Sequence, residues 1–142
     1  GSLQHSILRY LTVYGPSETD RELAQRLVPD RLRTSAYAVS HIKFAISKKP
    51  EIVQAFHAWL SGVEIAQARD LRDPVMLEAL AVIFGGGVDK MDEGMKVVQA
   101  LQQDFVKTYL DRCAQAGLDR SKMLTPPFQM ILDGTAFQKR PA

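Results

Sequence analysis

A face of mixed aromatic and basic side chains, within residues 33–49, is the feature of this sequence with the clearest chemistry. If the stretch is helical, the following residues lie along one side of it: Arg33, Tyr37, His41, Phe44 and Lys48. Exposed rings and cations together favour contact with an anionic, grooved partner. The hydroxyls of Ser35 and Ser40 suit phosphate oxygens. In the alternative, a neighbouring helix covers Tyr37 and Phe44, and the residue pattern leaves both interpretations open.

The charge is unevenly distributed along the chain. The formal net charge of the 142 residues is only +2. Residues 21–49, however, carry seven basic side chains against two acidic ones. This local excess of positive charge suits an anionic partner such as nucleic acid, although a solvated surface without a partner explains it equally well.

No group of residues forms a convincing catalytic or metal-binding constellation. The histidines His5, His41 and His57 do not combine with the single cysteine, Cys113, at ligand spacings, so no metal site is predicted. Cys113 falls in a helical apolar pattern, which favours a core thiol, and one cysteine cannot form an internal disulfide. The glycine-rich residues 84–90 lack the ending of a P-loop and follow no strand. We therefore predict neither an enzyme nor a cofactor.

The elements that would position these residues are all predicted to be helices. Apolar periodicity and end signals place them over residues 3–14, 19–28, 34–47, 50–62, 63–71, 74–84 and 89–116, with a short turn after Asp119 and a last segment over 126–132. The second helix should end at Val28-Pro29, because the residue before proline avoids the α region. No run alternates apolar and polar residues with β-branched enrichment, so no sheet is expected. The predicted fold is all-α, a compact domain of seven to nine helices.

The helices expected over 19–28 and 34–47 are the parts of a helix-turn-helix unit. Three stretches carry a family resemblance: Leu23-Ala24-Gln25-Arg26-Leu27, residues 35–42, and Pro50-Glu51-Ile52-Val53-Gln54-Ala55-Phe56. Over residues 18–88 the chain resembles the DNA-binding core of ParB-type plasmid and chromosome partition proteins, including KorB-like repressors. The resemblance implies a centromere- or operator-binding domain, of partition or transcription-regulator type, whose partner is double-stranded DNA.

The same resemblance implies roles for individual residues of the reading helix. The groove would be lined by Ser35, Tyr37, Ser40, His41 and Lys43. Phosphates would be held by Arg33, Lys48 and Lys49. Phe44 shares the face that these residues form, so it completes the predicted DNA-binding set.

A second class of function is an interaction or scaffold domain in a larger assembly. It would use the long helix expected over residues 89–116, which begins at Asp89 and ends with Ala116 before Gly117. Its apolar repeat, Val97, Leu101, Phe105 and Tyr109, could bind a protein partner or a second copy. The pattern favours the simpler interpretation that this helix is the spine of the domain's own core.

The length of the chain fits one domain. Gly1-Ser2 is typical of a cloning scar, residues 3–132 are expected to form a single helical domain, and residues 133–142 a frayed tail. No run of 18 apolar residues is present, so no membrane span is predicted. A single cysteine is compatible with a cytoplasmic location.

Overall fold

The computed structural model describes residues 2–135, and within them every regular element is helical. Six α-helices are present: α1 Ser2–Tyr14, α2 Glu18–Lys48, α3 Val53–Leu71, α4 Pro74–Gly85, α5 Met91–Gln115 and α6 Pro126–Leu132. Two short 3₁₀ helices, η1 Pro50–Ile52 and η2 Val88–Lys90, precede α3 and α5. The all-α prediction is confirmed. The predicted count of seven to nine helices is not, because two pairs of expected helices are continuous.

Helix α2 runs through Pro29, where the sequence predicts a break, so that boundary is wrong. The helix-turn-helix unit is not confirmed, since one helix replaces the two that would flank its turn. Proline costs a helix interior about 3 kcal/mol, because it removes one hydrogen bond and its ring crowds the carbonyl four residues earlier. Pro29 and Gln25, four residues earlier, are both exposed, so water can satisfy the freed Gln25 carbonyl. Residues 30–36 contain no glycine to help the chain turn.

The start of α2 also lies earlier than predicted. Ser17 is the N-cap, and its Oγ accepts a hydrogen bond from the backbone N–H of Asp20 at 3.1 Å. The predicted start was Thr19. From Ser17 the helix runs for 31 residues, about 46 Å at 1.5 Å per residue.

Helix α3 likewise continues through Gly62, where the sequence predicts a stop. A glycine ends a helix by adopting a left-handed conformation, and Gly62 is not among the glycines with positive φ. Gly86 does behave in this way: its φ of 83° caps α4 at the predicted position. The turn expected after Asp119 is present as turns without a helix.

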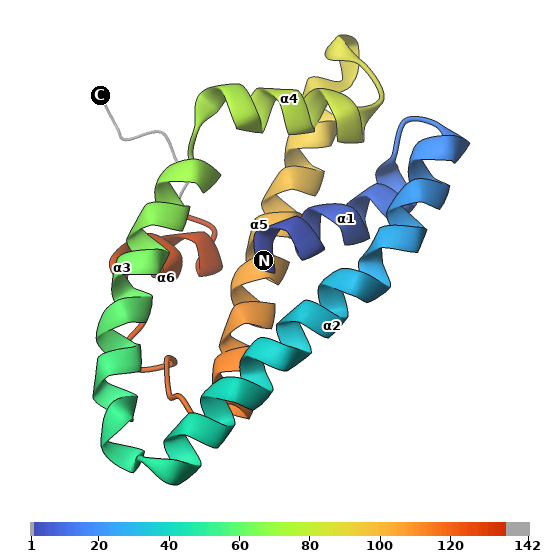
Figure 1. The fold of residues 1–142 in the computed structure, drawn as a ribbon. Coiled ribbons are helices and arrows are strands. Elements are labelled where there is room, and N and C mark those ends of the chain that lie inside the picture. Colours follow the sequence, from blue (N-terminus) through green and yellow to red (C-terminus); the bar gives the residue numbers. More distant parts are fainter. Residues whose placement is uncertain (1, 136–142) are drawn as a thin grey trace, which may run out of the picture.

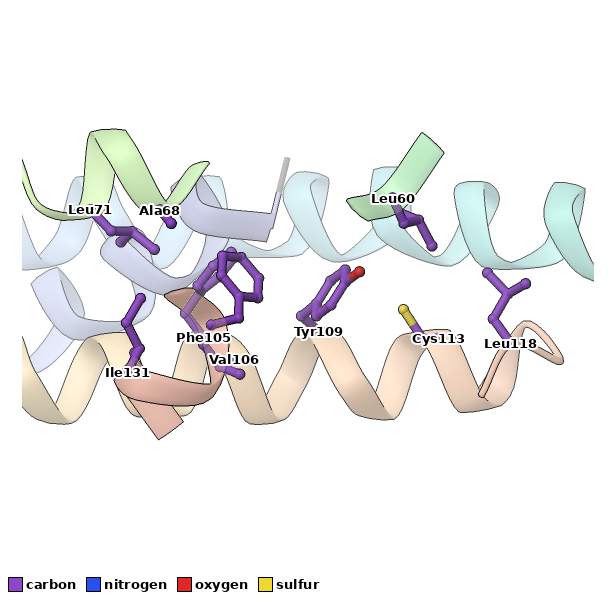
Figure 2. Packing of buried hydrophobic residues seen from close by; sticks show 10 residues of the cluster. Leu60, Ala68, Leu71, Phe105, Val106, Tyr109, Cys113, Leu118 and Ile131 are labelled. Carbon is purple, nitrogen blue, oxygen red and sulfur yellow. The ribbon is translucent and has the colours of Figure 1, made fainter. Parts of the chain in front are cut away.

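Helix α5 is the spine of the core (Figure 1). Its apolar face is buried, with Leu101 1%, Phe105 0% and Tyr109 9% exposed. Figure 2 shows Leu60, Ala68 and Leu71 of α3 facing the side chains of α5. Leu101, Phe105 and Tyr109 of the predicted partner surface are therefore core residues, which agrees with the simpler interpretation that this helix is the spine of the domain's own core.

The helices α4 and α5 cross at very close range. A Cβ added to Gly94 of α5 would lie 1.7 Å from the carbonyl oxygen of Ala81 on α4. Only glycine permits this approach, which lets Leu77, Ala81 and Phe84 of α4 join the second core cluster with Val98 and Leu101.

The ends and the surface add two facts. After α6, residues 133–134 form a turn, and the last part of the predicted tail, residues 136–142, lies outside the described residues. None of the helices formed by residues 2–135 has the length and apolar character needed to cross a bilayer.

Candidate interaction surface

Helix α2 lies along one edge of the molecule, with α1 and α5 on its inner side (Figure 1). Of its 31 residues only Ala24 is buried. Tyr37 and Phe44 are 66% and 63% exposed, so the question raised by their spacing is settled: no neighbouring helix within the described chain covers them. A helix this long and this exposed presents a large surface to solvent.

The predicted DNA-binding residues lie mostly on that surface. Eight are exposed: Arg33, Tyr37, Ser40, His41, Lys43, Phe44, Lys48 and Lys49. Ser35 is partly buried and faces the inner side of α2, next to Val39 and Ile42, so it does not share the face of Tyr37. The structure therefore exposes all the aromatic and basic members, whereas Ser35 lies on the inner side of α2.

Local pairs order the exposed side chains. Arg33 Nη2 lies 2.9 Å from Asp30 Oδ1 in an exposed ion pair. Tyr37 and His41 stack with ring centroids 6.2 Å apart, and the Lys48 Nζ lies 5.5 Å from the centre of the Phe44 ring. The rings and cations thus form contacting pairs along one stripe, with Asp30 as its acidic member.

The exposed stripe has a regular spacing that extends beyond the predicted site. We call it the outer seam of α2, and it consists of Leu23, Leu27, Asp30, Thr34, Tyr37, His41, Phe44 and Lys48. Successive members are separated alternately by four and three residues, which is a seven-residue repeat. All eight are exposed. Leu23, Leu27 and Thr34 were not predicted to share this face, because the sequence predicts a helix end at Pro29 between them.

An apolar groove lies between α2 and α3, with α5 as its floor, and Thr34 of the outer seam is among the residues that line it. Its volume is about 270 Å³, and its walls include Val39, Ile42 and Val63. Trp59, 60% exposed, stands at its rim. Ligand pockets usually have volumes from about 300 Å³ upward, so this groove is a weaker candidate than the outer seam.

The most concentrated polar group in the described chain is buried beneath the surface of α3. Glu64 and Arg120 are 0% and 1% exposed. Arg120 Nε and Nη2 donate to Glu64 Oε1 at 2.9 and 2.6 Å, and the Tyr109 hydroxyl donates to the same oxygen. The backbone N–H of Thr125 donates to Glu64 Oε2 at 3.2 Å. Both carboxylate oxygens are therefore occupied by donors of the protein itself.

The rest of the Arg120 guanidinium is also held by α3. Its Nη1 donates to the His57 carbonyl at 3.3 Å, and its Nη2 donates to Ser61 Oγ at 3.3 Å. Burial lowers the pKa of Arg120, but the hydrogen bonds and charge of Glu64 outweigh burial and raise it overall. Burial, followed by the hydrogen bond to Glu64, raises the pKa of the Tyr109 hydroxyl. The cluster holds the segment after α5 against α3, and the paired charges of Glu64 and Arg120 fit a structural role better than catalysis.

Sequence reasoning did not find this cluster. One signal was present: Glu64 lies between Val63 and Ile65 in an apolar stretch of α3, and a buried carboxylate needs a partner. Nothing in the sequence assigned Arg120 to it. Cys113 is buried as predicted, and burial raises the pKa of its thiol. No group of three or more His, Cys, Asp or Glu residues in the described chain could hold a metal ion.

Comparisons of the chain with protein-family models, with curated proteins and with solved structures find no match. The ParB-type resemblance therefore stays a prediction that rests on the sequence stretches alone.

Proposed function

We propose that this protein is a non-enzymatic α-helical interaction module that binds a macromolecular partner through the outer seam of α2. The observation that carries the proposal is the exposure of Tyr37 and Phe44 on a 31-residue helix with one buried residue. Large aromatic side chains contribute little to folding when they remain in water, but they are the residues that anchor protein interfaces.

A protein partner is favoured over nucleic acid by the composition of the outer seam. Leu23 and Leu27 are 55% and 42% exposed, and exposed leucines suit an apolar partner surface. Asp30 is an acidic member of the same stripe and already pairs with Arg33, so part of the positive charge is neutralised. A phosphate backbone would be repelled by Asp30 and would leave the leucines without contacts.

Double-stranded DNA is the second candidate, and one observation favours it. Residues 31–50 contain no acidic side chain, and Lys43, Lys48 and Lys49 are all exposed there. Together with the ParB-type resemblance, this supports DNA binding of partition or transcription-regulator type. Such binding would use α2 as one continuous helix, because the predicted helix-turn-helix is replaced by it.

Photo-crosslinking in the cells that produce the protein tests the first proposal. A photoreactive amino acid is placed at Tyr37 or Phe44, and the control carries it at Val75 of α4, which is 76% exposed. We expect adducts of one defined mass from the two α2 positions and none from the control. The absence of adducts from α2, or the same adducts from all three positions, would contradict the proposal.

Fluorescence anisotropy with duplex DNA tests the second candidate. DNA binding through α2 predicts saturable binding that weakens steeply between about 50 and 200 mM salt, because each neutralised phosphate releases counterions. Substituting both Lys43→Ala and Lys48→Ala would then flatten the salt dependence. Binding that survives this double substitution unchanged would remove α2 from the DNA hypothesis.

A further inference from the structure

The outer seam repeats over nearly the full length of α2. Its first member is Leu23 and its last is Lys48, a span of about 38 Å at 1.5 Å per residue. Two helices wind around each other through apolar residues that repeat every seven positions. Four of the eight seam positions carry apolar or aromatic side chains: Leu23, Leu27, Tyr37 and Phe44. The pattern therefore fits a second long helix better than a flat or globular surface.

The seam is complementary to itself when the second helix runs in the opposite direction. An antiparallel pair centred between residues 35 and 36 places alternate positions of the repeat against each other. The opposed pairs are Leu27 with Phe44, Asp30 with His41, Thr34 with Tyr37, and Leu23 with Lys48. Leu27 meets an aromatic ring, and the acidic member meets the imidazole. Lys48 places its aliphatic chain against Leu23.

The charge along α2 also favours the antiparallel direction. Residues 18–30 contain four acidic and two basic side chains, a net charge of −2, whereas residues 31–49 contain five basic and no acidic ones, a net charge of +5. Antiparallel pairing sets the negative half of one helix against the positive half of the other. A parallel pair would oppose Asp30 to Asp30 and Lys48 to Lys48.

The residues that flank the seam do not obstruct this arrangement. Arg26 and Arg33 lie on one side of it, and the antiparallel register brings them opposite Ser47 and Ser40, so no like charges meet there. The inner side of α2 is occupied by α1 and α5, which leaves the outer edge of the molecule open to a second copy (Figure 1).

We infer that the partner of the outer seam is a second copy of this chain, and that the two α2 helices pair antiparallel in a symmetric dimer. This inference rests on the proposed function and names its partner. A two-fold axis passes near Ser35 and Ala36, so each seam contact occurs twice in the dimer.

Sedimentation velocity over a range of concentrations tests the dimer. We expect the unaltered chain to form a dimer, and Leu27→Glu or Phe44→Glu to weaken its association by about a hundredfold or more, because each substitution removes two apolar contacts. The matched controls are Ile65→Glu and Val75→Glu, at residues 54% and 76% exposed on α3 and α4. They should leave association unchanged. Circular dichroism on every variant checks that the fold is retained.

Charge reversal tests the direction of pairing. Asp30→Lys should weaken the dimer about tenfold, by removing the attraction to His41 on the second copy and placing a cation beside it. Adding His41→Glu to Asp30→Lys should restore the association of the dimer, because the two substituted residues again carry opposite charges. In a parallel pair Asp30 would face itself, so Asp30→Lys would exchange one like-charge contact for another, and His41→Glu would give no rescue.

The outcomes separate this inference from the proposed function. A dimer that survives Phe44→Glu uses another surface and overturns the inference. A monomer at all concentrations also overturns it; adducts of Tyr37 or Phe44 with a different protein would then leave the proposed function standing. A monomer that gives no α2 adducts and binds DNA with a steep salt dependence contradicts both and supports the DNA candidate.

Discussion

Removing the charge of Glu64 should destabilise the fold strongly. Glu64→Gln keeps the shape of the side chain but leaves the Arg120 guanidinium, 1% exposed, without a counter-charge. Breaking a buried ion pair by removing one partner costs about 3 to 5 kcal/mol. For a chain of 142 residues the entropy of unfolding is about 0.3 kcal/mol/K, so the melting temperature should fall by about 10 to 17 °C.

The assay is urea denaturation followed by far-ultraviolet circular dichroism, with the midpoint and slope fitted separately. The matched control removes the exposed pair of Asp30 and Arg33, whose atoms also lie 2.9 Å apart. Arg33→Ala should cost less than about 1 kcal/mol, because water already solvates both charges. The two variants therefore compare one chemical interaction at two depths of burial.

A double substitution tests whether the unpaired charge causes the loss of stability. Glu64→Met with Arg120→Met removes both charges and both desolvation costs, so it should be more stable than the Glu64→Gln variant. A loss below about 1 kcal/mol for Glu64→Gln would refute the assignment of the cluster as a structural link. The cluster would then have to be reconsidered as a functional site, because a buried charge pair that does not support the fold needs another explanation.

Three further predictions concern other parts of the structure. Gly94→Ala should lower the free energy of unfolding by about 1 to 3 kcal/mol, because the added Cβ would lie 1.7 Å from the Ala81 carbonyl oxygen. Gly62→Ala, where an added Cβ has nothing within 4 Å, should instead raise it by up to about 1 kcal/mol. Thermal melts of the two variants test this contrast. Burial, then Arg112 and Arg9, lowers the pKa of His5 from 6.5, so the unfolded chain takes up the proton first and stability should fall as the pH drops below about 6.5. His5→Gln should make the free energy of unfolding less dependent on pH, which denaturation at a series of pH values measures. An unchanged pH dependence would show that other groups cause it. Native Cys113 should react far more slowly with iodoacetamide than the thiol in urea, since it is buried and its pKa is raised; equal rates would show that the core opens readily.

The sequence predicted the helices whose ends carry strong chemical signals. Gly86 supplies the left-handed residue that ends α4, and Asp73 caps its start by accepting from the Val75 N–H at 2.9 Å. Both signals act through a few neighbouring residues, so they can be recognised without the fold. Pro29 and Gly62 failed as stop signals because their effects are costs of about 3 and 1 kcal/mol. The packing of α1 on α2, and the anchoring of Glu64 on α3, outweigh such costs.

In the candidate site, too, the features that depend on the packing of distant helices could not be predicted from the sequence. The exposure of Tyr37 and Phe44 depends on where every other helix packs, so the sequence left it open and the structure decided it. The partial burial of Ser35 has the same origin, because the inner side of α2 is defined only once α3 and α5 are placed beside it. The buried contact between Glu64 and Arg120 joins residues 56 positions apart, a separation that no local pattern encodes.

The separation of buried and exposed polar groups has a consequence for how binding can be tested. The buried charges that hold the fold lie between α3 and the segment after α5, whereas Tyr37 and Phe44 of the outer seam are mostly exposed. Changing a side chain that is 63% exposed removes little buried area, so Phe44→Glu should shift the unfolding free energy by less than about 0.5 kcal/mol. Association and folding are then independent readouts in one variant. A Phe44→Glu protein that lost several kcal/mol of stability as a monomer would show that the ring packs in solution, and the seam would no longer be a free surface.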